Sequence, residues 1–252
     1  MNLRLAILGG GRAAWAYGSA WRRIGAPISG VWLRPESQSR LPELLNAERR
    51  SIDDAARHSD MVLIAVSDRA IGEIAASIPM TEAVIFHASG ALPSVRGGFS
   101  LHPLRVLRPV GKPSDLRDAL LVFEGAHREV AQSIASAVGA RFAEVSAEVK
   151  PLSHAAAVFG ANYVAAILEI AEELMSRAGI SGSRNDIAAL ADSAVRNWAA
   201  HTDVRRFTGP AARGDRETIA RHLAVLEDNP QVAEIYGVLA ERIARTILAA
   251  SE

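Results

Sequence analysis

The sequence predicts an α/β domain followed by an all-helical domain, on three observations. Residues 1–149 alternate short, continuous apolar runs with helix-like segments, as in a mostly parallel, doubly wound sheet with strands covered on both faces. After Pro151 the strand-like runs stop and long helical patterns follow. Three glycines lie between the first apolar run and the first helical segment. We therefore expect an α/β domain over 1–149 and an all-α domain over 150–252.

The elements follow in order from these patterns. The expected strands are the apolar runs LRLAILG, ISGVWLR, MVLIAVS, AVIFHAS and ALLVFEG, at residues 3–9, 28–34, 61–67, 83–89 and 119–125. Helix-like segments include Arg12–Gly25 and Arg69–Ser77. Beyond the change of pattern, helices are expected over 151–178, 184–202, 215–227 and 230–250, separated by glycine- and proline-containing breaks.

Composition excludes several classes of protein. The chain has 252 residues, with 28 Lys plus Arg against 28 Asp plus Glu, so no net charge favours nucleic acid or an anionic membrane. It has no cysteine, which excludes disulfides and thiolate chemistry. We expect a cytoplasmic protein without a signal peptide. Residues 151–168 carry no full charge over 18 positions, and their alanine-rich, partly polar composition favours a buried core helix over a membrane span.

The glycine cluster has the form of a phosphate-binding turn. Gly9, Gly10 and Gly11 follow a predicted strand and open a predicted helix through Arg12, Ala13 and Ala14. The first glycine permits a tight turn, the third admits a pyrophosphate close to the backbone, and Ala14 still allows close helix–strand packing. Free N–H groups at the helix start favour phosphate. This context predicts a Rossmann dinucleotide-binding domain, with a plain tight turn as the alternative.

Arg34 at the end of the second strand indicates which dinucleotide is bound. It lies twenty residues beyond Ala14, where NAD-binding proteins place an acid for the ribose hydroxyls. A guanidinium there would bind a 2′-phosphate, with Ser37, Ser39 and Arg40 nearby to assist. We therefore expect NADP (NADPH). The alternative is a solvated arginine, and the nearby Glu36 keeps it open.

Several motifs together resemble a known superfamily. These are LGGGRAA, SDMVLIAVSDRAI, FHASGAL, SLHPL, HAAAVFGANY and FTGPAARGDRETIARHL, which extend nearly from end to end. They are similar to the 6-phosphogluconate-dehydrogenase-like and pyrroline-5-carboxylate-reductase-like proteins, and more closely to a bacterial branch of Rossmann-like oxidoreductases with a C-terminal domain of unknown function. The resemblance implies hydride transfer to or from nicotinamide, with a proton donor and an asparagine on the helix between the domains.

The remaining site residues follow two strand ends, where doubly wound sheets bind ligands. Ala65, Val66 and Ser67 would pass under the cofactor. Asp68, just before a helical run, is interpreted as the N-cap of that helix rather than a catalytic acid. Ser89, at the next strand end, would lie near the nicotinamide and offer its hydroxyl to a substrate oxygen, or would belong to an ordinary turn. His102 would face the cleft or serve as a structural hydrogen-bonding residue.

The helix that begins at Pro151 carries the main chemical hypothesis. At 100° per residue, His154 and Asn162 share a stripe about 80° wide and lie roughly 12 Å apart along the axis. By resemblance, His154 would protonate the oxygen or nitrogen of a C=O or C=N group as hydride arrives, and Asn162 would orient the substrate or the carboxamide. The alternative is a pair of core residues hydrogen-bonded between helices. The resemblance also implies an aromatic residue before His154, where the chain has Ser153.

Two function classes remain open from the sequence. One is an NADP-dependent reductase or dehydrogenase for a small carbonyl, imine or hydroxy-acid substrate, which would be anionic if Thr208 and Arg213 reach the cleft. The other is a dinucleotide-binding redox sensor or partner-binding protein without turnover. No histidine or acidic spacing predicts a metal site. Because residues 151–168 are apolar nearly all round, we expect a homodimer joined through the C-terminal domains.

Overall fold

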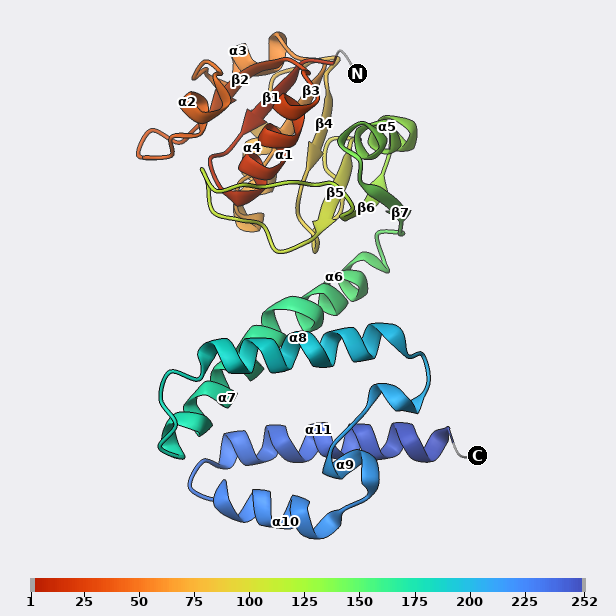
Figure 1. The fold of residues 1–252 in the computed structure, drawn as a ribbon. Coiled ribbons are helices and arrows are strands. Elements are labelled where there is room, and N and C mark those ends of the chain that lie inside the picture. The colour runs from red at the N-terminus through yellow and green to blue at the C-terminus, as the bar shows by residue number, and fades with distance from the viewer. Residues whose placement is uncertain (1–2, 251–252) are drawn as a thin grey trace. The chain divides into compact units, whose positions relative to one another are not determined.

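The structure, a computed structural model, describes residues 3–250 and divides into two compact units (Figure 1). The first unit is Met1–Ala161 and the second is Asn162–Glu252. The first turns of the long helix therefore pack with the sheet, beyond the boundary predicted at residue 150. Whether that boundary separates the functional domains stays a prediction.

The first unit contains a seven-stranded sheet in the order β2-β1-β3-β4-β5-β6-β7. All neighbouring strands are parallel except β5 and β6, which pair antiparallel. The predicted α/β class with a mostly parallel sheet is confirmed. The strands are β1 (Leu5–Leu8), β2 (Ile28–Trp32), β3 (Met61–Ile64), β4 (Val84–His87), β5 (Phe99–Leu104), β6 (Leu120–Gly125) and β7 (Arg141–Glu144).

Sequence reasoning missed β5 and β7 because neither is a continuous apolar run. β7 has charged residues at both ends. β5 contains His102 and Pro103, and proline cannot donate a hydrogen bond to a neighbouring strand. β5 tolerates it because its pairing with β4 covers only Phe99 and Ser100, so Pro103 lies beyond the parallel ladder.

Helices cover both faces of the sheet, as a doubly wound fold requires. On one face, buried side chains of the sheet pack with α1 (Arg12–Arg23), α2 (Leu41–Leu45) and α5 (Arg128–Val138). On the other face they pack with α3 (Ile52–Arg57) and α4 (Asp68–Ser77). Strands β1 and β3 are buried along their whole length, which explains why their sequences are apolar at every position.

The second unit is all helical, as predicted. One long helix crosses the boundary as α6 (Lys150–Val158), a π-helical segment η1 (Phe159–Tyr163) and α7 (Val164–Arg177). The helices after it are α8 (Arg184–Ala200), the 3₁₀ turn η2 (Val204–Arg206), α9 (Pro210–Arg213), α10 (Arg216–Val225) and α11 (Pro230–Ala249). Asp215 and Asn229 cap α10 and α11 by accepting hydrogen bonds from the backbone N–H groups of Thr218 and Val232.

The long helix is exposed within the single chain, so the expected burial in the chain's own core is wrong. Leu152 and Phe159 are 71% and 68% exposed. The helices of the second unit pack in small groups, α7 on α8 and α9 with α10 and α11, and such groups enclose little interior. Among residues 3–250, Lys150–Arg177 is the one helix that is long and apolar enough to cross a membrane. Length and composition alone are weak evidence for a membrane span.

Candidate functional site

The glycine turn connects β1 to α1 and passes very close to the end of β3. Gly9 has φ +133°, and a Cβ there would collide with the carbonyl oxygen of Ala65. Gly10 faces Leu33, whose Cδ2 would lie 2.6 Å from an added Cβ. Gly11 has no atom within 4 Å of that position. Two of the glycines therefore satisfy the protein's own packing, whereas the third leaves open space in front of the helix N-terminus.

This turn forms one wall of a cleft at the carboxyl ends of the parallel strands. The opposite walls come from the segments that follow β2 and β3, on either side of β1. This is the point at which the chain winds to opposite sides of β1, where doubly wound sheets bind ligands. The cleft is lined by Gly9, Gly10, Gly11, Arg12, Ala13, Trp32, Leu33, Arg34, Glu36, Ser37, Ala65, Val66 and Ser67.

The predicted cofactor-binding residues line this cleft, with the exception of Ala14; of the residues expected to assist Arg34, Ser37 lines it and Ser39 and Arg40 do not. Ala14 is fully buried in the core cluster with α1 and the sheet. That position agrees with the packing role given to it, since a larger side chain there would push the helix away from the strand.

The segment after β2 is folded back onto the glycine turn. Ser39 Oγ donates a hydrogen bond to the carbonyl oxygen of Gly10 at 2.7 Å. The Arg34 carbonyl oxygen accepts hydrogen bonds from the Ser37 N–H and from Arg49 Nη2, both at 3.0 Å. The backbone at Arg34 is therefore held from two sides, while its exposed side chain lines the cleft.

A hydrogen bond joins buried Ser89, after β4, to exposed Asp68, after β3. Ser89 Oγ donates to Asp68 Oδ2 at 2.9 Å and accepts hydrogen bonds from the N–H groups of Ala91 and Leu92. Asp68 is the first residue of α4, whose N-cap is Ser67, so the N-cap interpretation of Asp68 is wrong. The carboxylate instead accepts a hydrogen bond from the Ser89 hydroxyl and so stabilises the turn after β4.

Two imidazole rings meet over this turn. His102 and His154 pack edge to face, with ring centroids 5.4 Å apart and an interplanar angle of 85°. Gly90 lies against both rings, because a Cβ there would collide with His154 Cδ2 and lie 3.0 Å from two ring carbons of His102. The structure thus brings His154 to the turn that contains Ser89, as the sequence hypothesis requires.

Sequence reasoning missed a buried lysine whose charge acts on His102. The side chain of Lys150, 1% exposed, donates from Nζ to Ser100 Oγ at 2.5 Å. Ser100 in turn donates to Glu124 Oε2 at 3.2 Å, and Glu124 also accepts from the N–H and hydroxyl of Ser94. Lys150 is the last charged residue before an uncharged segment of 18 residues. A lone charge at the start of an apolar helix was the sequence signal that could have marked it as a functional candidate.

Burial and charge act together on the titratable groups of this cluster. Burial holds the pKa of Lys150 below its usual value, and the carboxylates of Glu124 and Asp68 oppose that shift. Burial also lowers the pKa of His87 and of His102, and the positive charge on Lys150 adds to both shifts. His87 Nε2 donates to the Pro93 carbonyl oxygen and its Nδ1 accepts from the Ser89 N–H. We therefore assign His87 as a neutral structural residue.

Asn162 lies in the π-helical segment, so the regular spacing assumed for the stripe with His154 is wrong. A π turn closes its hydrogen bonds one residue later than an α turn, which changes the direction of each following side chain. Asn162 is exposed. π segments occur often at functional sites, but the catalytic assignments of His154, Asn162 and Ser89 stay predictions.

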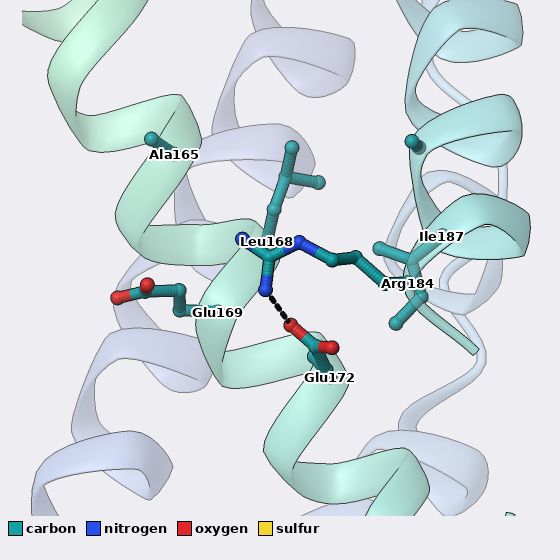
Figure 2. Close-up of a pocket in the computed structure, with 7 residues that line it drawn as sticks. Ala165, Leu168, Glu169, Glu172, Arg184 and Ile187 are labelled. Carbon is teal, nitrogen blue, oxygen red and sulfur yellow. Dashed lines mark hydrogen bonds and ion pairs between the residues drawn. The ribbon is translucent and has the colours of Figure 1, made fainter. Parts of the chain in front are cut away.

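A second hollow lies within the second unit between α7 and α8 (Figure 2). Arg184 extends from α8 toward α7, where Nη1 bonds Glu172 Oε2 at 2.6 Å. Apolar side chains of Leu168 and Ile187 form much of the remaining wall. None of these residues was expected to be functional from the sequence.

The comparisons with known proteins agree with this architecture. Residues 121–243 match the family model described as a domain of unknown function, DUF2520. A candidate NADP oxidoreductase from Bacteroides fragilis superimposes with a TM-score of 0.81 at 23% identity, covering 97% of this chain and 98% of that chain. A protein from Thermotoga maritima has a TM-score of 0.77 at 21% identity, covering 98% and 100%. The comparison with curated proteins gives no match.

A more distant solved structure includes a bound cofactor. A reductive aminase from Aspergillus terreus in complex with NADPH and ethyl levulinate has a TM-score of 0.65 at 15% identity, covering 97% of this chain and 94% of that chain. At such identities these likenesses establish the fold. The chain thus has the Rossmann oxidoreductase fold with a helical C-terminal region. The match to DUF2520 begins in β6 and continues through the helical region, in agreement with the resemblance noted from the sequence.

Proposed function

We propose that this protein is an NADP-dependent oxidoreductase that transfers a hydride between nicotinamide and a small carbonyl, imine or hydroxy-acid substrate. The observation that carries the proposal is the cleft between the glycine turn, Arg34 and the end of β3. The open space at Gly11 fits a pyrophosphate beside a helix N-terminus. The NADPH in the reductive aminase and the description of the Bacteroides protein support the same cofactor.

The proposed roles fall on the two clusters of the first unit and on Asn162. Gly9, Gly10, Gly11, Arg12 and Ala13 would hold the pyrophosphate, Arg34 the 2′-phosphate, and Ala65, Val66 and Ser67 the ribose side of NADPH, which supplies the hydride. His154 donates the proton to the substrate oxygen or nitrogen. Ser89, through its hydrogen bond to Asp68, positions the turn that contacts His154. Asn162 orients the substrate.

Two alternatives have specific support. Glu36 lines the same cleft as Arg34, and a carboxylate there favours the free ribose hydroxyls of NAD. A dinucleotide-binding sensor without turnover would use the same glycine turn, because a fold does not determine chemistry. Turnover of NADPH with a panel of keto acids, imines and hydroxy acids separates an enzyme from a sensor.

We also propose that the active form is a cytoplasmic homodimer joined through the second units. The support is the exposure of large apolar side chains on its helices, including Leu190 at 71% and Trp198 at 63%. Exposed apolar surface of this extent is typical of a protein interface. Light scattering at micromolar concentration that shows a monomer would contradict this proposal.

Substitutions at two glycines of the turn are expected to have different effects, one on stability and the other on cofactor binding. Gly9→Ala should destabilise the first unit by about 1–3 kcal/mol, because its positive φ and its contact with Ala65 both resist a side chain. Gly11→Ala should cost no more than about 1 kcal/mol at the helix N-cap, yet weaken NADPH binding at least about tenfold by filling the open space. Urea unfolding and NADPH fluorescence titration measure the two effects.

Arg34→Ala tests the cofactor assignment directly. Loss of a charge-assisted contact worth roughly 1.5–3 kcal/mol should weaken NADPH binding about 10- to 150-fold. NADH affinity should barely change, because a 2′-hydroxyl gives the guanidinium little to bind. Arg34→Asp should reverse the preference, and added salt should weaken NADPH binding more than NADH binding.

Arg57→Ala is the matched control for this titration. Arg57 pairs with Asp53 within α3 and does not line the cleft, so its loss should leave both affinities unchanged. Equal losses of NADPH and NADH affinity in Arg34→Ala would mean that Arg34 only shapes the loop, and the NADP assignment would be wrong.

A further inference from the structure

His102 and His154 form a close ring contact that the proposed role of His154 does not by itself explain. The two rings come from different elements, β5 and α6, and pack edge to face at 5.4 Å. Gly90 lies against both, so no side chain at that position could separate them. A glycine at this place lets two ionisable rings approach each other at the end of the sheet.

The backbone fixes the proton on one ring. His102 Nδ1 lies 3.0 Å from the carbonyl oxygen of Ala88. A carbonyl oxygen only accepts hydrogen bonds, so Nδ1 carries the hydrogen in both charge states of the ring. In neutral His102 the lone pair is therefore on Nε2, and this is the only ring nitrogen that can gain or lose a proton.

The surrounding charges limit the number of protons that the two rings hold. Lys150 on α6 and a protonated His154 both lower the pKa of His102, while Asp68 on α4 opposes them. Glu124 on β6 offsets part of the Lys150 charge, and His87 on β4 is neutral. Two added protons on the pair would place two like charges about 5 Å apart, and the Lys150 charge acts on His102 in the same direction.

We propose that His102 and His154 form a two-imidazole acid–base pair that holds at most one added proton, with His154 as the donor and His102 as its positioning residue. The proposal rests on the proposed reductase function for its substrate. As hydride reaches the carbon of a C=O or C=N group, an N–H bond of protonated His154 breaks and an O–H or N–H bond forms on the substrate. Both rings are then neutral, and the pair regains its proton from water.

The test is a pH titration of the full-length protein, with histidines labelled with ¹³C and ¹⁵N and followed by NMR. Single replacements assign the seven histidine signals. In the unmodified protein, neutral His102 should show the Nδ1–H tautomer and a midpoint below the ordinary 6.5. In His154→Asn the His102 midpoint should rise, because the neighbouring positive charge is gone. Lys150→Met should move it in the same direction.

His58→Asn is the control, since His58 lies on the exposed end of α3 and pairs with Asp54; the His102 midpoint should not change in it. An Nε2–H tautomer in the unmodified protein, which needs no variant, would overturn the proposal. An unchanged His102 midpoint in both His154→Asn and His154→Gln would do the same. Absence of NADPH binding with the coupling intact would overturn the proposed function instead and leave the pair standing.

Discussion

Lys150→Met is expected to lower the free energy of unfolding of the first unit by about 3–5 kcal/mol, the cost of leaving a buried charge without its partner. Methionine fills similar volume but cannot donate to Ser100. The carboxylate of Glu124, 5% exposed, then keeps its hydrogen bonds from Ser94 and Ser100 but loses the compensating ammonium.

A double-mutant cycle separates this charge effect from simple packing. Glu124→Gln should also destabilise the unit, and Lys150→Met combined with Glu124→Gln should cost less than the sum by about 0.5–3 kcal/mol. Urea unfolding in a Trp198→Phe background provides the measurement, because the other three tryptophans all lie in the first unit. Additive losses would show that the two charges do not interact through Ser100.

The stability difference between the unmodified protein and Lys150→Met is expected to depend on pH. Burial lowers the pKa of Lys150 in the folded chain below its usual 10.5. Between the lowered value and 10.5 the unfolded chain binds more protons than the folded chain, so stability rises with pH in that window. The unmodified protein should therefore gain stability relative to Lys150→Met as the pH increases toward 10.5. A constant difference would mean that Lys150 does not titrate on unfolding.

His154→Ala is expected to reduce turnover by about 100- to 10,000-fold once a substrate is found, the range for loss of a general acid. NADPH affinity should be nearly unchanged, because the predicted cofactor cleft does not include His154. The loss should appear in kcat as well as in kcat/KM, since proton donation acts only in the transition state. Stopped-flow NADPH oxidation and a binding titration measure the two quantities.

His58→Ala is the matched control, an exposed histidine of the same unit that should leave turnover unchanged. Full activity of His154→Ala on the true substrate would remove His154 from the mechanism. A lower urea midpoint with equal loss of cofactor binding would support the core-residue alternative.

The glycine turn shows which features the local sequence determines by itself. A continuous apolar run followed by three glycines and a small-residue helix start determines a strand–turn–helix, because backbone sterics at Gly9 and burial on both faces of β1 act over only a few residues. The predicted cofactor residues, apart from Ala14, line one cleft because the carboxyl ends of parallel strands share one edge of the sheet. The fold class and the helical C-terminal part were equally readable from pattern.

The cluster around Lys150, by contrast, is formed only by the tertiary structure. Lys150, Ser100 and Glu124 are 24 to 50 residues apart along the chain. No spacing rule joins them, because they meet only where β5 and β6 are neighbours in the sheet and α6 brings Lys150 to Ser100. The same is true of the His102–His154 contact and of Asp68, whose partner Ser89 is 21 residues away. The π turn at Asn162 and the exposure of the long helix also escaped the sequence. Hydrophobic periodicity describes the face of one element, whereas these features depend on which other elements pack against it.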